Sequence, residues 1–165
     1  MKKILLASLL FSSFTAADTK MLLIGDSLSV GVNQVSTQTT CLHCETGIGI
    51  DKLTSKISAK KITKKFDCAV IFVGTNDFNM GYSEKRYLGK LNKLYSIIAS
   101  QSNSGKVFFA MPNPKRSDVK RGLQRFAGAY SGFDKVILPV STSKDGVHYQ
   151  SYKGIYKLIE NKCWL

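Results

Sequence analysis

Residues 20–29 have the sequence KMLLIGDSLS, an apolar run that ends in a glycine and is followed at once by a polar segment. Continuous apolar runs of this kind, without alternating polar residues, are typical of strands buried on both faces of a parallel sheet. Similar runs recur along the chain, each followed by a segment of helical or loop character. They are a weak one at residues 40–46, CAVIFVG at 68–74, KVFFAM at 106–111 and KVILPV at 135–140.

Helical periodicity fills most of the segments between these runs. The predicted helices cover residues 51–60, 83–99, 117–130 and 150–161. Alternation of strands and helices predicts one α/β domain, a three-layer α/β/α sandwich with a mostly parallel five-stranded sheet. Pro139 lies within the last apolar run, which indicates that this strand is at an edge of the sheet.

The chain begins with the pattern of an export signal. Lys2 and Lys3 precede a short, mostly apolar run over residues 4–14, and the small residues 15–17 follow. This order is typical of a secretory signal peptide, and the run is too short to span a bilayer. A buried N-terminal strand or helix is the alternative. We expect residues 1–17 to be a signal peptide and residues 18–165 to be one domain, secreted or periplasmic.

Export to an oxidising compartment favours disulfide bonds between the four cysteines. These allow three pairings, among which the sequence does not choose: Cys41, Cys44, Cys68 and Cys163. The C-x-x-C motif at residues 41–44 could also serve redox chemistry or bind zinc, although a second such motif and a suitable histidine pair are missing. We expect structural disulfides, and neither a metal nor a cofactor.

The formal net charge is +13, and loss of Lys2 and Lys3 with the signal peptide lowers it by two, to +11. Such a charge attracts anionic partners, which for an exported protein would be cell-envelope polymers or lipid head groups. No signature of the common nucleic-acid-binding modules is present. Two basic groups are either solvated helix faces or an envelope-binding surface. They are the lysines of residues 52–65 and the set Lys115, Arg116, Lys120, Arg121 and Arg125.

Four polar clusters stand directly after four of the predicted strands. The carboxyl ends of parallel strands share one edge of a sheet, and ligands bind in the crevice there. We therefore expect the clusters to form one site. They are Gly25-Asp26-Ser27-Leu28-Ser29, Gly47-Ile48-Gly49, Gly74-Thr75-Asn76-Asp77 and Asp145-Gly146-Val147-His148.

The residue types in these clusters indicate nucleophilic catalysis. A serine hydroxyl such as that of Ser27 becomes a strong nucleophile when a neighbouring base takes its proton. The imidazole of His148 can be that base, because imidazoles exchange protons near neutral pH. Asp145, three residues earlier, is close enough to bond the imidazole and fix its tautomer. The other histidine, His43, lies between two cysteines, and we expect it to be structural or exposed.

The clusters resemble the four blocks of the SGNH, or GDSL, hydrolase family of esterases and lipases. The first, third and fourth match its nucleophile, G-x-N-D and D-x-x-H blocks, and the resemblance spans almost the whole mature chain. It implies a flavodoxin-like sheet with the strand order 2-1-3-4-5 and a catalytic triad of Ser27, Asp145 and His148.

The same resemblance implies an oxyanion hole. Its donors would be the backbone N–H groups of Ser27 and Gly47 and the side-chain amide of Asn76. The glycine of the second block is either Gly47 or Gly49. Simpler roles remain open: Ser27 as a helix cap and Asn76 as a turn residue, with Asp77 either in a turn or joining loops of the site.

Together these features predict a secreted serine ester hydrolase that acts through an acyl-enzyme. The small domain leaves little sequence for a lid or a deep acyl channel, so we expect short acyl substrates, such as acetyl esters of envelope carbohydrate. One alternative is a lysophospholipase or thioesterase acting on longer acyl chains. Another is a non-catalytic envelope-binding protein with the same fold.

Overall fold

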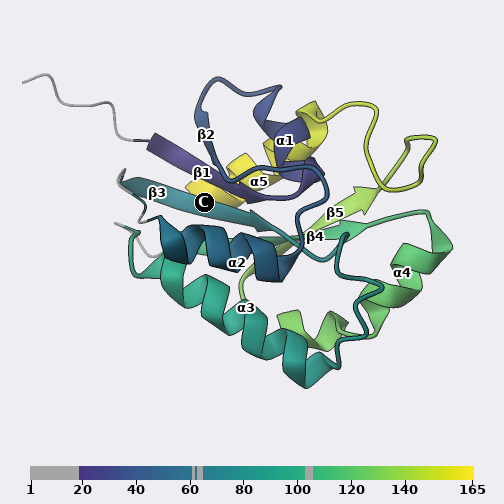
Figure 1. The fold of residues 1–165 in the computed structure, drawn as a ribbon. Helices are drawn as coiled ribbons and strands as arrows, with labels where there is room; N and C mark the ends of the chain where they lie inside the picture. Colours follow the sequence, from purple (N-terminus) through teal and green to yellow (C-terminus); the bar gives the residue numbers. More distant parts are fainter. Residues whose placement is uncertain (1–18, 61, 63–64, 103–105) are drawn as a thin grey trace, which may run out of the picture.

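The computed structural model describes residues 19–60, 62, 65–102 and 106–165, so the predicted signal peptide lies outside the described residues. A five-stranded, all-parallel sheet with the order β2-β1-β3-β4-β5 forms the centre of the molecule (Figure 1). The strands are β1 (Thr19–Gly25), β2 (Thr39–Leu42), β3 (Phe66–Phe72), β4 (Lys106–Asn113) and β5 (Lys135–Val140). The α/β architecture and the predicted strand order are confirmed, and β5 is an edge strand, as Pro139 indicates.

Helices cover both faces of the sheet (Figure 1). Helices α1 (Ser27–Asn33) and α5 (Lys153–Trp164) pack on one face. Helices α2 (Ile50–Ala59) and α3 (Glu84–Ala99), together with the 3₁₀ turn η1 (Ala127–Tyr130), pack on the other. Helix α4 (Ser117–Gln124) follows β4 at the carboxyl end of the sheet. None of the helices described is long and apolar enough to cross a membrane.

The apolar strands are explained by burial on both sides. In β1, Leu22 and Ile24 belong to the core under α2 and α3, whereas Met21 and Leu23 belong to the core under α1 and α5. Strand β3 alternates in the same way. Each residue of 21–24 and of 68–72 faces one core or the other, which is why no polar residue interrupts these runs.

The predicted helix over residues 117–130 is wrong in its second half. It ends at Gln124, and η1 begins only at Ala127. Between them Phe126 has φ −128° and ψ 18°, outside the helical region. Its side chain is buried and stacks on Tyr87 with ring centroids 4.0 Å apart. Burial of this ring therefore overrides the helical periodicity of the segment.

The last helix is displaced along the chain from its prediction, since it covers Lys153–Trp164 instead of residues 150–161. Tyr149 does not join it: its buried ring packs edge-on against Tyr152, and its hydroxyl donates to the carbonyl of Pro139. At the other end the helix continues to Trp164 with Cys163 packed in the core.

Two disulfide bonds are present, Cys41–Cys44 and Cys68–Cys163, which confirms the prediction of structural disulfides and selects one of the three pairings. The first closes the turn after β2. The second joins strand β3 to the last turn of α5, and both of its cysteines are fully buried.

Candidate active site

A tight turn after β1 places Ser27 at the first position of helix α1. Gly25 has φ +132°, and a Cβ there would lie 1.9 Å from the carbonyl oxygen of Phe72, so the turn requires glycine. Asp26 caps the helix, because its Oδ1 accepts the N–H of Leu28 at 2.9 Å. The cap is therefore Asp26 and not Ser27, which leaves the Ser27 hydroxyl available for other partners.

Ser27, His148 and Asp145 form one hydrogen-bonded chain. The Oγ of Ser27 lies 2.6 Å from Nε2 of His148, and Nδ1 of His148 lies 2.5 Å from Oδ2 of Asp145. Residues 121 positions apart in the sequence thus meet, with the imidazole between hydroxyl and carboxylate. This is the arrangement in which a histidine takes a proton from a serine and an aspartate holds the imidazole in place.

Local hydrogen bonds keep Asp145 ionised. Its carboxylate accepts the hydroxyl of Ser143, and its Oδ1 also accepts the backbone N–H groups of Val147 at 2.9 Å and His148 at 3.0 Å. Donation by Ser143, followed by the bonds from His148, holds the pKa of Asp145 well below its usual range. The carboxylate is therefore negative at any pH where the histidine can act as a base.

The loop over residues 141–148 is fixed both internally and to its neighbour. The N–H of Ser143 donates to the carbonyl of His148 at 3.0 Å. The carbonyl of Gly146 accepts the N–H groups of Lys115 at 2.7 Å and Arg116 at 3.1 Å. Gly146 has φ +72°, and a Cβ there would be 2.9 Å from the backbone nitrogen of Arg116. The segment between β4 and α4 therefore holds the histidine loop in position.

Asn76 lies beside Ser27 and uses only part of its donor capacity among the residues that the structure describes. Both residues line the same cavity, and Nδ2 of Asn76 donates to the carbonyl of Ile48 at 3.1 Å. An amide nitrogen carries two hydrogens, so one remains for a ligand. The bond to Ile48 also fixes the amide against the second polar cluster.

The structure gives the two candidate glycines of the second cluster different surroundings. Gly47 has φ +79°, is exposed, and does not line the cavity around Ser27. Gly49 is the N-cap residue before helix α2, and a Cβ there would lie 2.6 Å from Oδ1 of Asp77. Gly47 stays a predicted oxyanion donor. Gly49 is needed because Asp77 approaches its Cα closely.

Asp77 joins loops of the site, the second of the two roles the sequence left open. Its Oδ1 accepts the N–H of Ile50 at 2.9 Å, and its Oδ2 accepts the hydroxyl of Tyr87 at 3.2 Å. Burial raises the pKa of this carboxyl. The network continues through Tyr130, which contacts Tyr87 at 3.2 Å and donates to the carbonyl of Val73 at 3.1 Å. Helical spacing predicts the burial of Tyr87 but gives no sign of its hydroxyl contacts.

A second buried acid lies directly before the nucleophile. Burial raises the pKa of Asp26 to about 6, although the Thr75 hydroxyl and the Leu28 N–H, both donating to its carboxylate, act in the opposite direction. Thr75 thus connects the first and third clusters. The sequence places Thr75 in the third cluster but assigns it no role, because a threonine in a turn has no distinctive pattern.

A cavity of about 140 Å³ surrounds the Ser27–His148 pair. It brings together parts of the first, third and fourth clusters with three residues that sequence reasoning did not place in the site. The lining consists of Ser27, Thr75, Asn76, Asp145, Val147 and His148, and of the unexpected Phe78, Arg116 and Val119. Within the described ranges no group of three histidine, cysteine, aspartate or glutamate side chains could hold a metal ion.

His43 does not line this cavity. It occupies the turn closed by the Cys41–Cys44 disulfide, with φ 53°, and its Nε2 is buried with no hydrogen-bond partner among the residues described. Burial, followed by the nearby Lys56 and Lys60, lowers its pKa.

Comparison with known proteins gives a fold likeness only. No protein-family profile and no curated protein sequence matches the chain. A GDSL-like lipase from Bacteroides thetaiotaomicron superposes with a TM-score of 0.66 at 17% identity, covering 88% of this chain and 87% of that one. A lipolytic protein of the G-D-S-L family from Veillonella parvula gives 0.60 at 13% identity, with 87% and 94% covered. A catalytic mutant of an acetylxylan esterase from Geobacillus stearothermophilus gives 0.65 at 14% identity, with 89% and 94% covered.

Proposed function

The chain has the fold of the SGNH, or GDSL, hydrolases, and on this premise we propose that it is a serine ester hydrolase. The observation that carries the proposal is the pair of hydrogen bonds that joins Ser27 to His148 and His148 to Asp145. Fold alone does not define an activity, because one fold hosts many functions. The proposal therefore depends on these three side chains.

Acylation begins when Nε2 of His148 takes the proton of the Ser27 hydroxyl while Oγ attacks the ester carbonyl carbon. Asp145, held ionised, stabilises the imidazolium that forms. The former carbonyl oxygen becomes negatively charged. It accepts hydrogen bonds from the free N–H of Asn76 and from the backbone N–H groups of Ser27 and Gly47. Collapse of this intermediate breaks the ester C–O bond, and His148 gives its proton to the departing alcohol.

Deacylation reverses these roles with water. The acyl group is now esterified to Ser27, and a water molecule in the cavity loses a proton to His148 as it attacks the acyl carbon. Release of the carboxylic acid returns the proton to Ser27. Atoms and protons balance over the cycle: one ester and one water give one acid and one alcohol.

The size of the cavity supports short acyl groups. A volume of about 140 Å³ around Ser27 and His148 suits an acetyl group, since drug-sized ligands occupy about 300–1,000 Å³. A separate apolar cavity of about 160 Å³ lies at residues 111–114 and shares no lining residue with the first. This apolar cavity is therefore no direct extension of the space around Ser27, and it gives no support to the lysophospholipase and thioesterase alternatives.

We propose acetyl esters of envelope carbohydrate as the substrate class. One fold neighbour is an acetylxylan esterase. Two disulfides are compatible with a secreted or periplasmic protein. The charge of +11 that remains after loss of Lys2 and Lys3 favours approach to anionic polymers of the envelope.

The test is hydrolysis of a chain-length series of 4-nitrophenyl esters, from acetate to octanoate, together with acetate release from acetylated cell-wall polysaccharide. We expect the acetate ester to give the highest kcat/KM, and Ser27→Ala to lower turnover by about 10⁴-fold or more with an unchanged circular dichroism spectrum. Ser131→Ala, at an exposed serine after η1, is the matched control.

Each alternative has its own outcome. A maximum at octanoate would favour the long-chain enzymes. Binding to the polysaccharide without turnover of any ester would favour the non-catalytic protein. A folded Ser27→Ala variant with more than about a tenth of the activity would show that Ser27 is not the nucleophile.

A further inference from the structure

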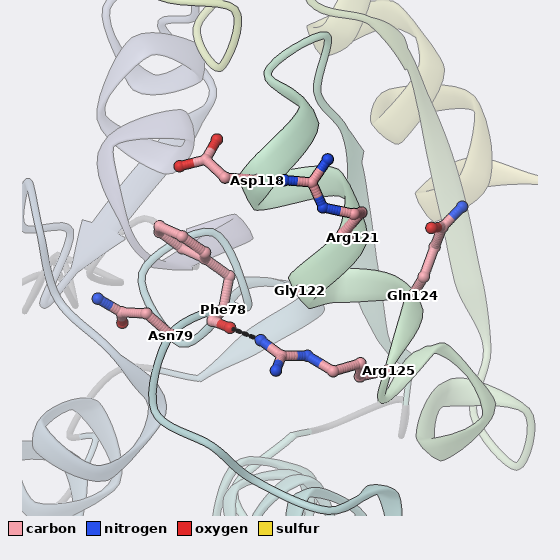
Figure 2. A pocket seen from close by; sticks show the side chains of 7 residues that line it. All are labelled: Phe78, Asn79, Asp118, Arg121, Gly122, Gln124 and Arg125. Atoms are coloured by element: carbon pink, nitrogen blue, oxygen red, sulfur yellow. Dashed lines mark hydrogen bonds between the residues drawn. The ribbon is translucent and has the colours of Figure 1, made fainter.

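A groove of about 670 Å³ adjoins the catalytic cavity, between residues 78–79 and helix α4 (Figure 2). Phe78 lines both spaces, so they adjoin at this residue. The groove is several times larger than the cavity of about 140 Å³ around Ser27. A substrate whose acyl group occupies the small cavity would therefore place its alcohol portion towards the groove.

The floor of the groove is held rigidly. Gly122 of α4 packs on Phe78 so closely that a Cβ there would lie 2.5 Å from the Phe78 Cβ. Arg125 donates from Nη2 to the carbonyl of Phe78 at 2.6 Å, the bond drawn in Figure 2. Arg116, at the catalytic cavity, lies over the Phe78 ring at 5.5 Å. Two arginines are thus used to fix this phenylalanine.

The groove also contains an arginine that the fold does not use. Arg121 is exposed and has no hydrogen-bond or ion-pair partner among the described residues, and in Figure 2 no dashed line reaches its guanidinium. Asp118, the acid in the groove lining, already accepts the Nε–H of Arg116 on its Oδ1 at 2.9 Å. The guanidinium of Arg121 is therefore available to an external anion.

The distribution of arginine in the sequence is also uneven. Lysine and arginine total 24, of which only Arg86, Arg116, Arg121 and Arg125 are arginine. Three of these four line the groove or the catalytic cavity. Arginine presents a planar fork that binds carboxylate and phosphate groups through two parallel hydrogen bonds, whereas lysine acts as a point charge. General attraction of anionic partners needs only positive charge, which lysine would supply equally well at these positions.

We propose that Arg121 binds an anionic group, a carboxylate or a phosphate, on the alcohol portion of the ester that is cleaved at Ser27. The inference rests on the proposed hydrolase function and narrows its substrates to acidic esters. The amides of Asn79 and Gln124, on opposite sides of the groove in Figure 2, can bind hydroxyl groups of the same alcohol.

The test uses three acetates of matched phenols: 4-acetoxyphenylacetate, 4-acetoxybenzyl phosphate and the neutral 4-acetoxyphenylacetamide. The wild-type kcat/KM for an anionic ester should exceed that for the neutral one by about tenfold or more, mostly through KM, as expected for a charge-assisted hydrogen bond. Arg121→Gln should reduce this ratio to about one, and Arg121→Lys should restore it only in part.

Lys120→Gln is the matched control, because it removes one positive charge from the adjacent residue, which does not line the groove. The control should keep the wild-type ratio. An equal loss of the ratio in both variants, or no loss in Arg121→Gln, would overturn the proposal. The larger of the two anionic ratios identifies the group as carboxylate or phosphate.

A binding measurement with ligands that are not hydrolysed separates failure of the groove proposal from failure of the hydrolase proposal. The amide analogue 4-acetamidophenylacetate and its neutral carboxamide can be titrated into wild-type, Ser27→Ala and Arg121→Gln proteins by NMR. We expect the wild-type and Ser27→Ala proteins to bind the anion about tenfold more tightly than its neutral counterpart. The Arg121→Gln protein should bind the two ligands equally. If no acetate is hydrolysed, the hydrolase proposal fails, and the absence of this binding preference would overturn the groove proposal as well.

Discussion

The nucleophile side of the candidate site and its histidine side each contain an aspartate, and their surroundings shift the two pKa values in opposite directions. Asp26 is buried before Ser27, and burial raises its pKa to about 6. Asp145 lies on an exposed loop, where hydrogen bonds, first from Ser143 and then from His148, lower its pKa. Burial disfavours a charge, and donors stabilise it.

This difference separates two tasks. Asp26, whose pKa burial raises to about 6, holds helix α1 and a neighbouring loop together by accepting the Leu28 N–H and the Thr75 hydroxyl. An acid that stays ionised can stabilise an imidazolium, which is the arrangement of Asp145 with His148. The nucleophile side is thus held by burial, and the histidine side by a local set of hydrogen bonds.

The largest expected effect is on the histidine side. Asp145→Asn should lower kcat for 4-nitrophenyl acetate by about 10⁴-fold, because the amide holds the imidazole in the wrong tautomer and carries no charge. Asp134→Asn, at an exposed acid 3.5 Å from Lys162, is the control. A loss smaller than about tenfold would mean that Asp145 does not orient the base.

On the nucleophile side, Asn76→Ala should lower kcat by about 10²–10³-fold with a smaller change in KM, because the amide donates most strongly to the oxyanion of the transition state. Steady-state kinetics with the same ester measure both parameters. A change in KM alone would make Asn76 a ground-state binding residue. Its bond to Ile48 is lost in either case, so the melting temperature should be recorded as well.

The stability contributions of Asp26 and Asp145 should depend on pH in opposite directions. Between its usual pKa of 3.8 and about 6, Asp26 is protonated in the native state and ionised in the unfolded state. The native state then binds more protons, so the contribution of Asp26 to the unfolding free energy falls as pH rises through this window, by about 3 kcal/mol in total. The difference between wild type and Asp26→Asn, from urea unfolding at several pH values, should show this fall and level off outside the window.

Asp145 should give the opposite slope. Its folded pKa is lowered, so its contribution to stability is present above the unfolded pKa and is lost as pH falls. The difference between wild type and Asp145→Asn should therefore increase with pH over the acid range. Slopes of the same sign for the two variants would contradict the comparison.

The smallest expected effect concerns Ser143. Ser143→Ala removes the first of the donors to Asp145, worth about 1 kcal/mol, and should lower kcat about fivefold. The pH–stability profile should change on its acid side, because the Asp145 carboxylate is held less firmly in its charged form. Thr142→Ala, at the exposed preceding residue, should leave the profile as it is.

Much of the fold could be predicted because its signals are local. Runs such as residues 68–74 are apolar throughout since both faces of the sheet are covered, and clusters after the strands share one edge by topology. The shared edge also predicts that Ser27 lies near His148, which is 121 positions away in the sequence. The break at Phe126 could not be predicted, because it depends on a ring contact with Tyr87, which lies on another helix.

Contacts between side chains distant in sequence account for the rest. Thr75, Phe78 and Arg116 carry no pattern that marks them as cavity residues, and the hydroxyl contacts of Tyr87 depend on how α3 packs over Asp77. The pairing of Cys68 with Cys163 depends equally on the docking of α5 against β3. Arg121 was visible in a basic cluster, but its lack of a partner among the described residues is a property of the packed helix alone.

The disulfide between Cys68 and Cys163 makes most of the chain a covalent ring. The two cysteines are 95 positions apart, and Asp145 and His148 lie inside the ring, whereas Ser27 lies on the segment outside it. A protease that cuts a surface loop within the ring opens it without producing two separate molecules. The half that carries the histidine stays tethered to the half that carries the serine, so a nicked chain can still bring its candidate catalytic groups together.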